Sequence, residues 1–139
     1  HTWVNGKCKY CGVSKKTVLG SEKRKLELET HAYEWIHTDN PERLLNMKFD
    51  VIISNPPYQL DDGGNGASAK PIYHRFIEQA EKLNPRYLTM IIPARWYAGG
   101  KGLDNFRKSM LNDTQISHLV DFVNAKDCFP GISIGGGVC

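Results

Sequence analysis

The sequence predicts an α/β fold with a mainly parallel sheet covered by helices on both faces. From about residue 31 onward, short β-branched or apolar runs alternate with segments of helical periodicity. This alternation is typical of parallel strands joined by helical crossovers. Residues 1–30 lack it and are rich in Lys, Gly and Thr. We therefore expect two parts: a basic leading segment, 1–30, and an α/β portion, 31–139.

Four strands are predicted from short runs of strand-forming residues, at 32–37, 50–54, 87–92 and 116–123. The second contains Val51, Ile52 and Ile53 in succession, a pattern typical of a strand buried on both faces. Residues 132–139 have the pattern of the beginning of a hairpin or of another strand.

Three helices are predicted between these strands. Asp39 or Asn40 caps the first, which begins at Pro41 and ends near residue 47. Pro71 opens the second, in which apolar residues recur at helical spacing. These residues are Ile72, Phe76, Ala80 and Leu83. The third helix is expected over 103–111.

The strand at 50–54 runs directly into Asn55, Pro56, Pro57 and Tyr58. The two prolines end the strand, fix the local backbone and carry no N–H donor. The Asn55 oxygen and the Pro56 carbonyl then form two acceptors, which match the two hydrogens of an amino group on a flat ring. A base would have to leave its helix to reach them. Alternatively, Pro-Pro-Tyr merely ends a strand or is a ligand for a proline-binding domain.

Parallel sheets bind ligands beyond the carboxyl ends of their strands. Asp39, Asn55 and Pro93 each follow a predicted strand. We therefore expect all three on one rim of the sheet. A plain helix cap accounts for Asp39 equally well.

At Asn55-Pro56-Pro57-Tyr58 the chain resembles the S-adenosylmethionine-dependent amino-methyltransferases, whose catalytic signature is Asn-Pro-Pro-Tyr at a strand end. The resemblance implies that Asn55 and Pro56 accept hydrogen bonds from the target amino group, and that Tyr58 stacks on the flipped base. In the same family, a carboxylate at the position suggested for Asp39 binds the adenine of the methyl donor.

Two later segments resemble the same family. Residues 93–102 are similar to a loop beside the active site, which implies that Arg95, Trp96 and Lys101 contact DNA or the flipped base. Simple packing is the alternative for Trp96. Residues 127–139 are similar to the late segment of adenine methyltransferases of restriction-modification systems. There Phe129 would pack against the flipped adenine, or else cover the edge of the sheet.

The resemblance implies part of a Rossmann-like methyltransferase domain, truncated at both ends, that takes part in adenine-N6 methylation of double-stranded DNA. A nuclease would accompany it as a further domain or subunit. The Gly-x-Gly turn that the family uses to hold the methyl donor is not visible in these residues. We therefore expect a fragment with the catalytic half of the domain, inactive by itself.

The composition limits the classes of protein to which the chain can belong. With 40% hydrophobic and 24% charged residues, no membrane-length apolar run and no signal-peptide pattern, the chain is expected to be globular and soluble. Its four cysteines do not have the pattern of a secreted disulfide framework, so a cytoplasmic location is expected. The net charge of +3 lies in residues 1–48, which hold nine Lys and Arg against six Asp and Glu. This basic part either follows phosphates or is a solvated surface.

Cys8 and Cys11 have the spacing of half a zinc knuckle. A closed zinc site needs four ligands, so His1, His31 or a second pair from elsewhere would have to complete it. Zinc is accordingly a second candidate cofactor beside S-adenosylmethionine.

Two other enzymatic substrates and one non-enzymatic function are open alternatives. A glutamine amide presents the same two hydrogens as adenine, and RNA adenine presents the same ring. A non-catalytic DNA-binding module would instead use residues 1–30 and the cysteine pair, and its binding would be sensitive to salt.

Overall fold

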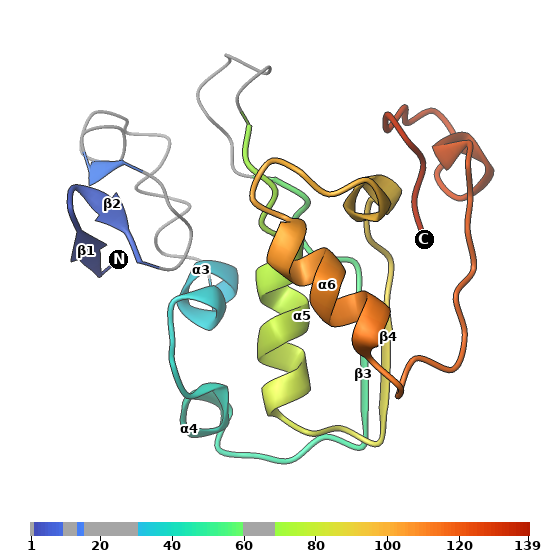
Figure 1. The fold of residues 1–139 in the computed structure, drawn as a ribbon. Helices are drawn as coiled ribbons and strands as arrows, with labels where there is room; N and C mark the ends of the chain where they lie inside the picture. Colours follow the sequence, from blue (N-terminus) through green and yellow to red (C-terminus); the bar gives the residue numbers. More distant parts are fainter. Residues whose placement is uncertain (1, 10–13, 16–30, 60–68) are drawn as a thin grey trace. The chain divides into compact units, whose positions relative to one another are not determined.

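The computed structural model describes residues 2–9, 14–15, 31–59 and 69–139, which mix helices with short strands (Figure 1). The chain divides into two compact units, each built from separate stretches of sequence. The first unit comprises His1–Ile52 and Arg75–Leu88, and the second comprises Ile53–His74 and Thr89–Cys139. This α/β content agrees with the predicted fold class. The predicted boundary near residue 30 falls outside the described residues and stays a prediction.

The first unit begins with a hairpin of β1 (Trp3–Val4) and β2 (Lys7–Cys8). The strands are antiparallel, with Trp3 opposite Cys8. Asn5 and Gly6 join them with φ angles of 49° and 74°, the left-handed values that an Asn-Gly turn favours between two strands. The sequence does not predict this hairpin because its strands are too short to show alternation.

Helix α3 (His31–Ile36) occupies the region where a strand was predicted at 32–37, so that prediction was wrong. Tertiary contacts account for the difference. Gln79, in α5 (Tyr73–Lys82), donates from its side-chain amide to the carbonyl oxygens of Trp35 (2.8 Å) and Thr38. Because the last carbonyls of a helix lack partners within it, these hydrogen bonds stabilise the helical form.

Helix α4 (Pro41–Leu45) confirms the helix predicted to begin at Pro41. Its cap is Asn40, whose side-chain oxygen accepts a hydrogen bond from the Arg43 backbone N–H at 3.2 Å. Asp39 is therefore not the cap. The helix ends two residues earlier than expected because Asn46 takes the left-handed conformation, with φ of 49°.

Strands β3 (Val51–Ser54) and β4 (Tyr87–Met90) pair in a two-stranded sheet. The Tyr87 N–H donates to the Asp50 carbonyl at 2.9 Å, and the Ile91 N–H donates to the Ser54 carbonyl at 3.0 Å. Both members of the second pair lie four residues further along, so the strands are parallel. With α5 between them in sequence, they form a β-α-β unit of the predicted kind.

Strand β3 is not buried on both faces, contrary to the prediction. Val51 is 50% exposed and Ile53 is 78% exposed, whereas the alternate residues of the strand are half-buried. Among the described residues the sheet has only two strands, and one face of β3 is left open. The β-branched run therefore correctly predicted a strand but not its environment.

The apolar face of α5 was predicted correctly. The residues named for the former, Ile72, Phe76, Ala80 and Leu83, are all buried. Helix α6 (Asp104–Asn112) lies where a helix was expected over 103–111. Its Phe106 is buried, and so is Leu103 at its N-cap. None of the helices in the described ranges is long and apolar enough to cross a membrane.

The predicted strand at 116–123 is not formed. Phe122 exchanges two backbone hydrogen bonds with Val138, at 2.8 and 3.0 Å, but Leu119, Val120 and Val123 are more than half exposed. A strand forms only where its backbone has hydrogen-bond partners along its length. The described residues supply such a partner only at Phe122. A short 3-10 helix, η2 (Ala125–Asp127), follows.

Residues 137–139 lie beside residues 92–94, which partly confirms the strand expected at 132–139. Ile92 and Cys139 exchange backbone hydrogen bonds at 2.9 and 2.8 Å. Gly137 is essential to this arrangement. A Cβ atom there would lie 2.2 Å from the Phe122 carbonyl oxygen, and its φ of 78° favours glycine.

Candidate functional site

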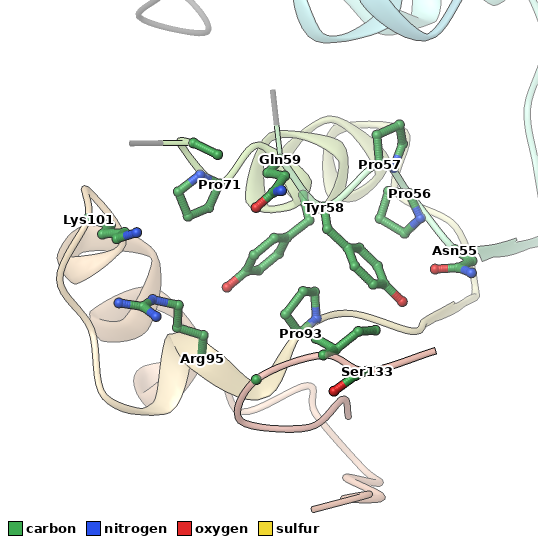
Figure 2. A pocket seen from close by; sticks show the side chains of 14 residues that line it. Asn55, Pro56, Pro57, Tyr58, Gln59, Pro71, Pro93, Arg95, Lys101 and Ser133 are labelled. Carbon is green, nitrogen blue, oxygen red and sulfur yellow. The ribbon is translucent and has the colours of Figure 1, made fainter. Parts of the chain in front are cut away.

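The second unit contains a cavity of about 720 Å³, a volume typical of sites for small organic ligands. The loop after β3, the loop after β4, the start of α5 and residues 133–135 line it (Figure 2). Asn55 and Pro93, which were predicted to share a rim at the carboxyl ends of two strands, both line this cavity. Parallel sheets place ligands at this edge.

The loop after β3 supplies hydrogen-bond acceptors. Asn55 is exposed, Pro56 is buried and Pro57 is exposed, and all three line the cavity. Because neither proline has an N–H, the backbone here presents carbonyl oxygens without a competing donor. The Asn55 side chain makes no hydrogen bond with another described residue, so its amide is available to a ligand.

Tyr58 is held by the backbone at the base of this loop. The Ile72 N–H donates to the Tyr58 carbonyl at 3.1 Å, and Gln59 and Pro71 form an antiparallel bridge beside them. The Tyr58 ring lines the cavity. Burial raises the pKa of the Tyr58 hydroxyl, with smaller contributions from the thiols of Cys128 and Cys139. The hydroxyl is therefore neutral near pH 7 and the ring presents an uncharged face.

The loop after β4 supplies cations. It begins with the 3-10 helix η1 (Ala94–Tyr97), which carries Arg95, and continues through four residues, 99–102, whose φ angles are all positive. Lys101 is among them, at 48°, a conformation uncommon for a side chain other than Gly, Asn or Asp. The Asp104 carboxylate accepts a hydrogen bond from the Gly100 N–H at 2.9 Å and fixes the turn.

The charges of the cavity are arranged at one end. Figure 2 shows Arg95 and Lys101 together on one side and Asn55 on the opposite side. The described residues that line the cavity include no carboxylate. A ligand that fits this arrangement carries a hydrogen-bond donor at one end and a negative charge at the other. A nucleotide with an amino-bearing base has this distribution.

Tyr73 also lines the cavity, although its sequence pattern does not predict this. It is the first residue of α5 and only 1% exposed. Its ring packs edge-on against that of Phe106, with the centroids 6.1 Å apart. The sequence places an aromatic residue next to the apolar stripe of a helix, where packing is its ordinary role. Only the cavity reveals that it faces a site.

Two other predicted contact residues do not line the cavity. Trp96 is buried, packs against the rings of Tyr97 and Phe106, and donates from Nε1 to the Cys139 Sγ at 3.3 Å. These contacts agree with the packing alternative. Phe129 is half-buried in the second unit and likewise lies outside the lining.

Asp39 does not follow a strand, which was the basis for expecting it on the rim. It follows helix α3 rather than a strand, belongs to the first unit, and its carboxylate is 3.3 Å from the Lys9 Nζ. The strand expected before Asp39 is a helix, so binding of the methyl donor by Asp39 stays a prediction without that support. Of the cysteine pair, Cys8 is buried in β2, and Cys11 lies outside the described residues.

The protein family described as the Eco57I restriction-modification methylase matches residues 5–129, which is most of the chain. The chain belongs to this family. It is also 37% identical, over 142 aligned positions, to an uncharacterized adenine-specific methylase of Mycoplasma pneumoniae. That alignment covers 95% of the chain and 33% of the relative, so the chain spans about a third of the length of the relative. No solved structure matches the chain.

Proposed function

We propose that the chain forms the base-binding part of an adenine-N6 DNA methyltransferase of a restriction-modification system. The observation that carries this proposal is the position of Asn55 and Pro56 at one end of a nucleotide-sized cavity, opposite Arg95 and Lys101. Family membership and the adenine-specific relative support it independently.

Asn55 and Pro56 would bind the two hydrogens of the adenine amino group. The lone pair of that nitrogen is delocalised into the ring, which makes it a poor nucleophile. Two acceptors that favour a pyramidal nitrogen would release the lone pair as the new bond forms, so they would act mainly on the transition state. Tyr58 would stack on the base once it has left the duplex, while Pro57 keeps the turn rigid.

Arg95 and Lys101 would bind a phosphate of the flipped nucleotide. Charge-assisted hydrogen bonds to phosphate are strong and independent of sequence, so these residues would position the nucleotide rather than identify its base. Trp96 is buried, so it would hold this loop in place by packing rather than contact the nucleotide. A contact between Phe129 and the base remains a prediction that the cavity does not support.

S-adenosylmethionine is the methyl donor that the family implies. The described lining residues match the base that would receive the methyl group, but they do not match the adenosyl part of S-adenosylmethionine. Among the described lining residues there is no carboxylate to bind the ribose hydroxyls. The roles of Asn55 and Pro56 do not depend on where the donor lies. We propose that the β-α-β unit is part of a larger Rossmann-like domain.

Zinc binding by Cys8 and Cys11 and an accompanying nuclease also remain proposals. For zinc, the described residues contain no cluster of three or more His, Cys, Asp or Glu placed to hold a metal ion. Zinc would therefore need Cys11 and ligands beyond those described.

The proposal is tested by supplying the full-length protein with tritium-labelled S-adenosylmethionine and three acceptors. These are duplex DNA with many adenines, the same sequence as RNA, and a glutamine-containing peptide. We expect label in the duplex only, recovered as N6-methyladenine after digestion. Label in RNA or peptide instead would reassign the substrate. DNA binding without transfer to any acceptor would favour the non-catalytic module.

A further inference from the structure

Tyr73 has a hydroxyl group that packing does not require. The residue is 1% exposed, lines the cavity, and is held by the edge-on contact of its ring with Phe106. A phenylalanine would fill the same space and make the same ring contact. Packing therefore accounts for the ring of Tyr73 but not for its hydroxyl.

The Tyr73 hydroxyl is buried, and its hydrogen has no acceptor among the described residues. A buried polar group without a partner destabilises the folded protein, so buried hydroxyls are nearly always paired. An unpaired one at the wall of a ligand-sized cavity indicates that the ligand supplies the partner. The Tyr58 hydroxyl is also buried without a partner among the described residues, but its ring already has a proposed stacking role.

The surroundings of Tyr73 make its hydroxyl a hydrogen-bond donor. Burial raises its pKa to about 12, and the nearby Cys139 thiol adds to this effect. The Arg95 guanidinium and the Trp96 backbone oppose the shift but do not cancel it. The hydroxyl therefore keeps its hydrogen at physiological pH, and no carboxylate among the described lining residues is present to accept it.

We propose that Tyr73 donates a hydrogen bond to a ring nitrogen of the base held in this cavity, and so contributes to selection of the base. The inference rests on the proposed function. The amino group is matched by Asn55 and Pro56, and the phosphate by Arg95 and Lys101. The ring nitrogens are the remaining strong acceptors of an adenine nucleotide's base, and one left unpaired in the cavity would weaken binding.

The test compares the full-length wild-type protein with Tyr73→Phe on duplexes whose target adenine is replaced by 1-deaza-, 3-deaza- or 7-deazaadenine. Each analogue lacks one ring acceptor and keeps the amino group. For the wild type, we expect one analogue to lower kcat/KM by about tenfold, the size of one buried hydrogen bond. Tyr73→Phe should lose about the same factor on adenine and show no further loss with that analogue.

Two further variants determine which tyrosine is the donor. Tyr87→Phe removes an exposed hydroxyl outside the cavity and should behave as wild type. Tyr58→Phe keeps the stacking ring and should retain the sensitivity to the analogue. If Tyr58→Phe abolishes that sensitivity instead, the donor is Tyr58 and the assignment of Tyr73 is wrong.

Thermal unfolding decides whether the hydroxyl is merely structural. Because the hydroxyl hydrogen has no acceptor in the described part of the protein, Tyr73→Phe should leave the Tm unchanged or raise it. A fall in Tm of several degrees, or a loss of activity that is equal for adenine and all three analogues, would overturn the proposal. If the wild type transfers no methyl group to any duplex, the proposed function fails and not only the role of Tyr73.

Discussion

The loops that follow β3 and β4 lie at the same edge of the sheet, but they differ in the residues that fix their backbone and in the groups they present to the cavity. The loop after β3 is fixed by Pro56 and Pro57 and presents acceptors. The loop after β4 is fixed by residues with positive φ angles, together with a carboxylate cap from Asp104, and it presents the cations of Arg95 and Lys101. This contrast supports the proposal that one cavity binds both ends of a nucleotide, with acceptors for the amino group and cations for the phosphate.

The largest effect is expected at the acceptor loop. Asn55→Ala should lower the rate of methyl transfer by at least about 100-fold, a loss typical of removing one group that stabilises a transition state. Binding of duplex DNA should change little, because Asn55 contributes no charge. Single-turnover transfer and a separate binding titration measure the two effects. Asn105→Ala, an exposed asparagine of α6, is the matched control. Near-normal transfer by Asn55→Ala would remove this loop from the chemistry.

The next effect concerns residues 137–139, which are hydrogen-bonded to residues 92–94 and to Phe122. Gly137→Ala should lower the free energy of unfolding by more than about 2 kcal/mol, since left-handed backbone alone disfavours alanine by roughly 1–2 kcal/mol. The added Cβ would also lie against the Phe122 carbonyl oxygen. Gly135→Ala is the control because its Cβ would meet no atom within 4 Å. Denaturant unfolding measures both, and equal stability of the two variants would contradict this packing.

The cationic loop should show a smaller effect, on binding. Arg95→Ala and Lys101→Ala should each weaken duplex binding by roughly tenfold and reduce the slope of log affinity against log salt by about one. Lys108→Ala removes an exposed charge from α6, outside the cavity, and is the control. If all three variants lose affinity equally, Arg95 and Lys101 have no special role at the cavity.

The smallest effect is a pH dependence of stability. The pKa of Tyr73 is about 12 in the folded protein, against about 10 when unfolded. The folded state therefore holds its proton more tightly, and the stability that this gives is fully present below pH 10 and lost as the pH rises toward 12. Denaturant titrations between about pH 9 and 11.5 should show a steeper decline for the wild type than for Tyr73→Phe. Parallel declines would contradict a buried, neutral hydroxyl.

The parts of the fold that depend on local chemistry could be predicted from the sequence. Helix α4 is specified by Asn40 and Pro41, and α5 by its apolar spacing. The position of Asn55 at a strand end followed from a β-branched run stopped by two prolines. Each of these features depends on residues within a few positions of one another.

The parts that depend on distant residues could not be predicted. The α3 segment is helical where its side chains favour a strand, and Gln79, more than forty residues away, bonds its last carbonyls. Tyr73 looks like an ordinary helical aromatic until the cavity is known. Lys101 lines the cavity from a left-handed backbone conformation. The glycines on either side of it suggest such a turn but do not specify it.

The most direct test of the account is whether a target base enters the cavity between the two loops. Once the methylated position has been mapped, 2-aminopurine can replace the target adenine, and its fluorescence rises when the base leaves the stack. We predict a rise on binding of the wild-type protein, and a smaller rise for Arg95→Ala and Lys101→Ala at saturating protein. Saturated binding of the wild type without any rise in fluorescence would contradict the account.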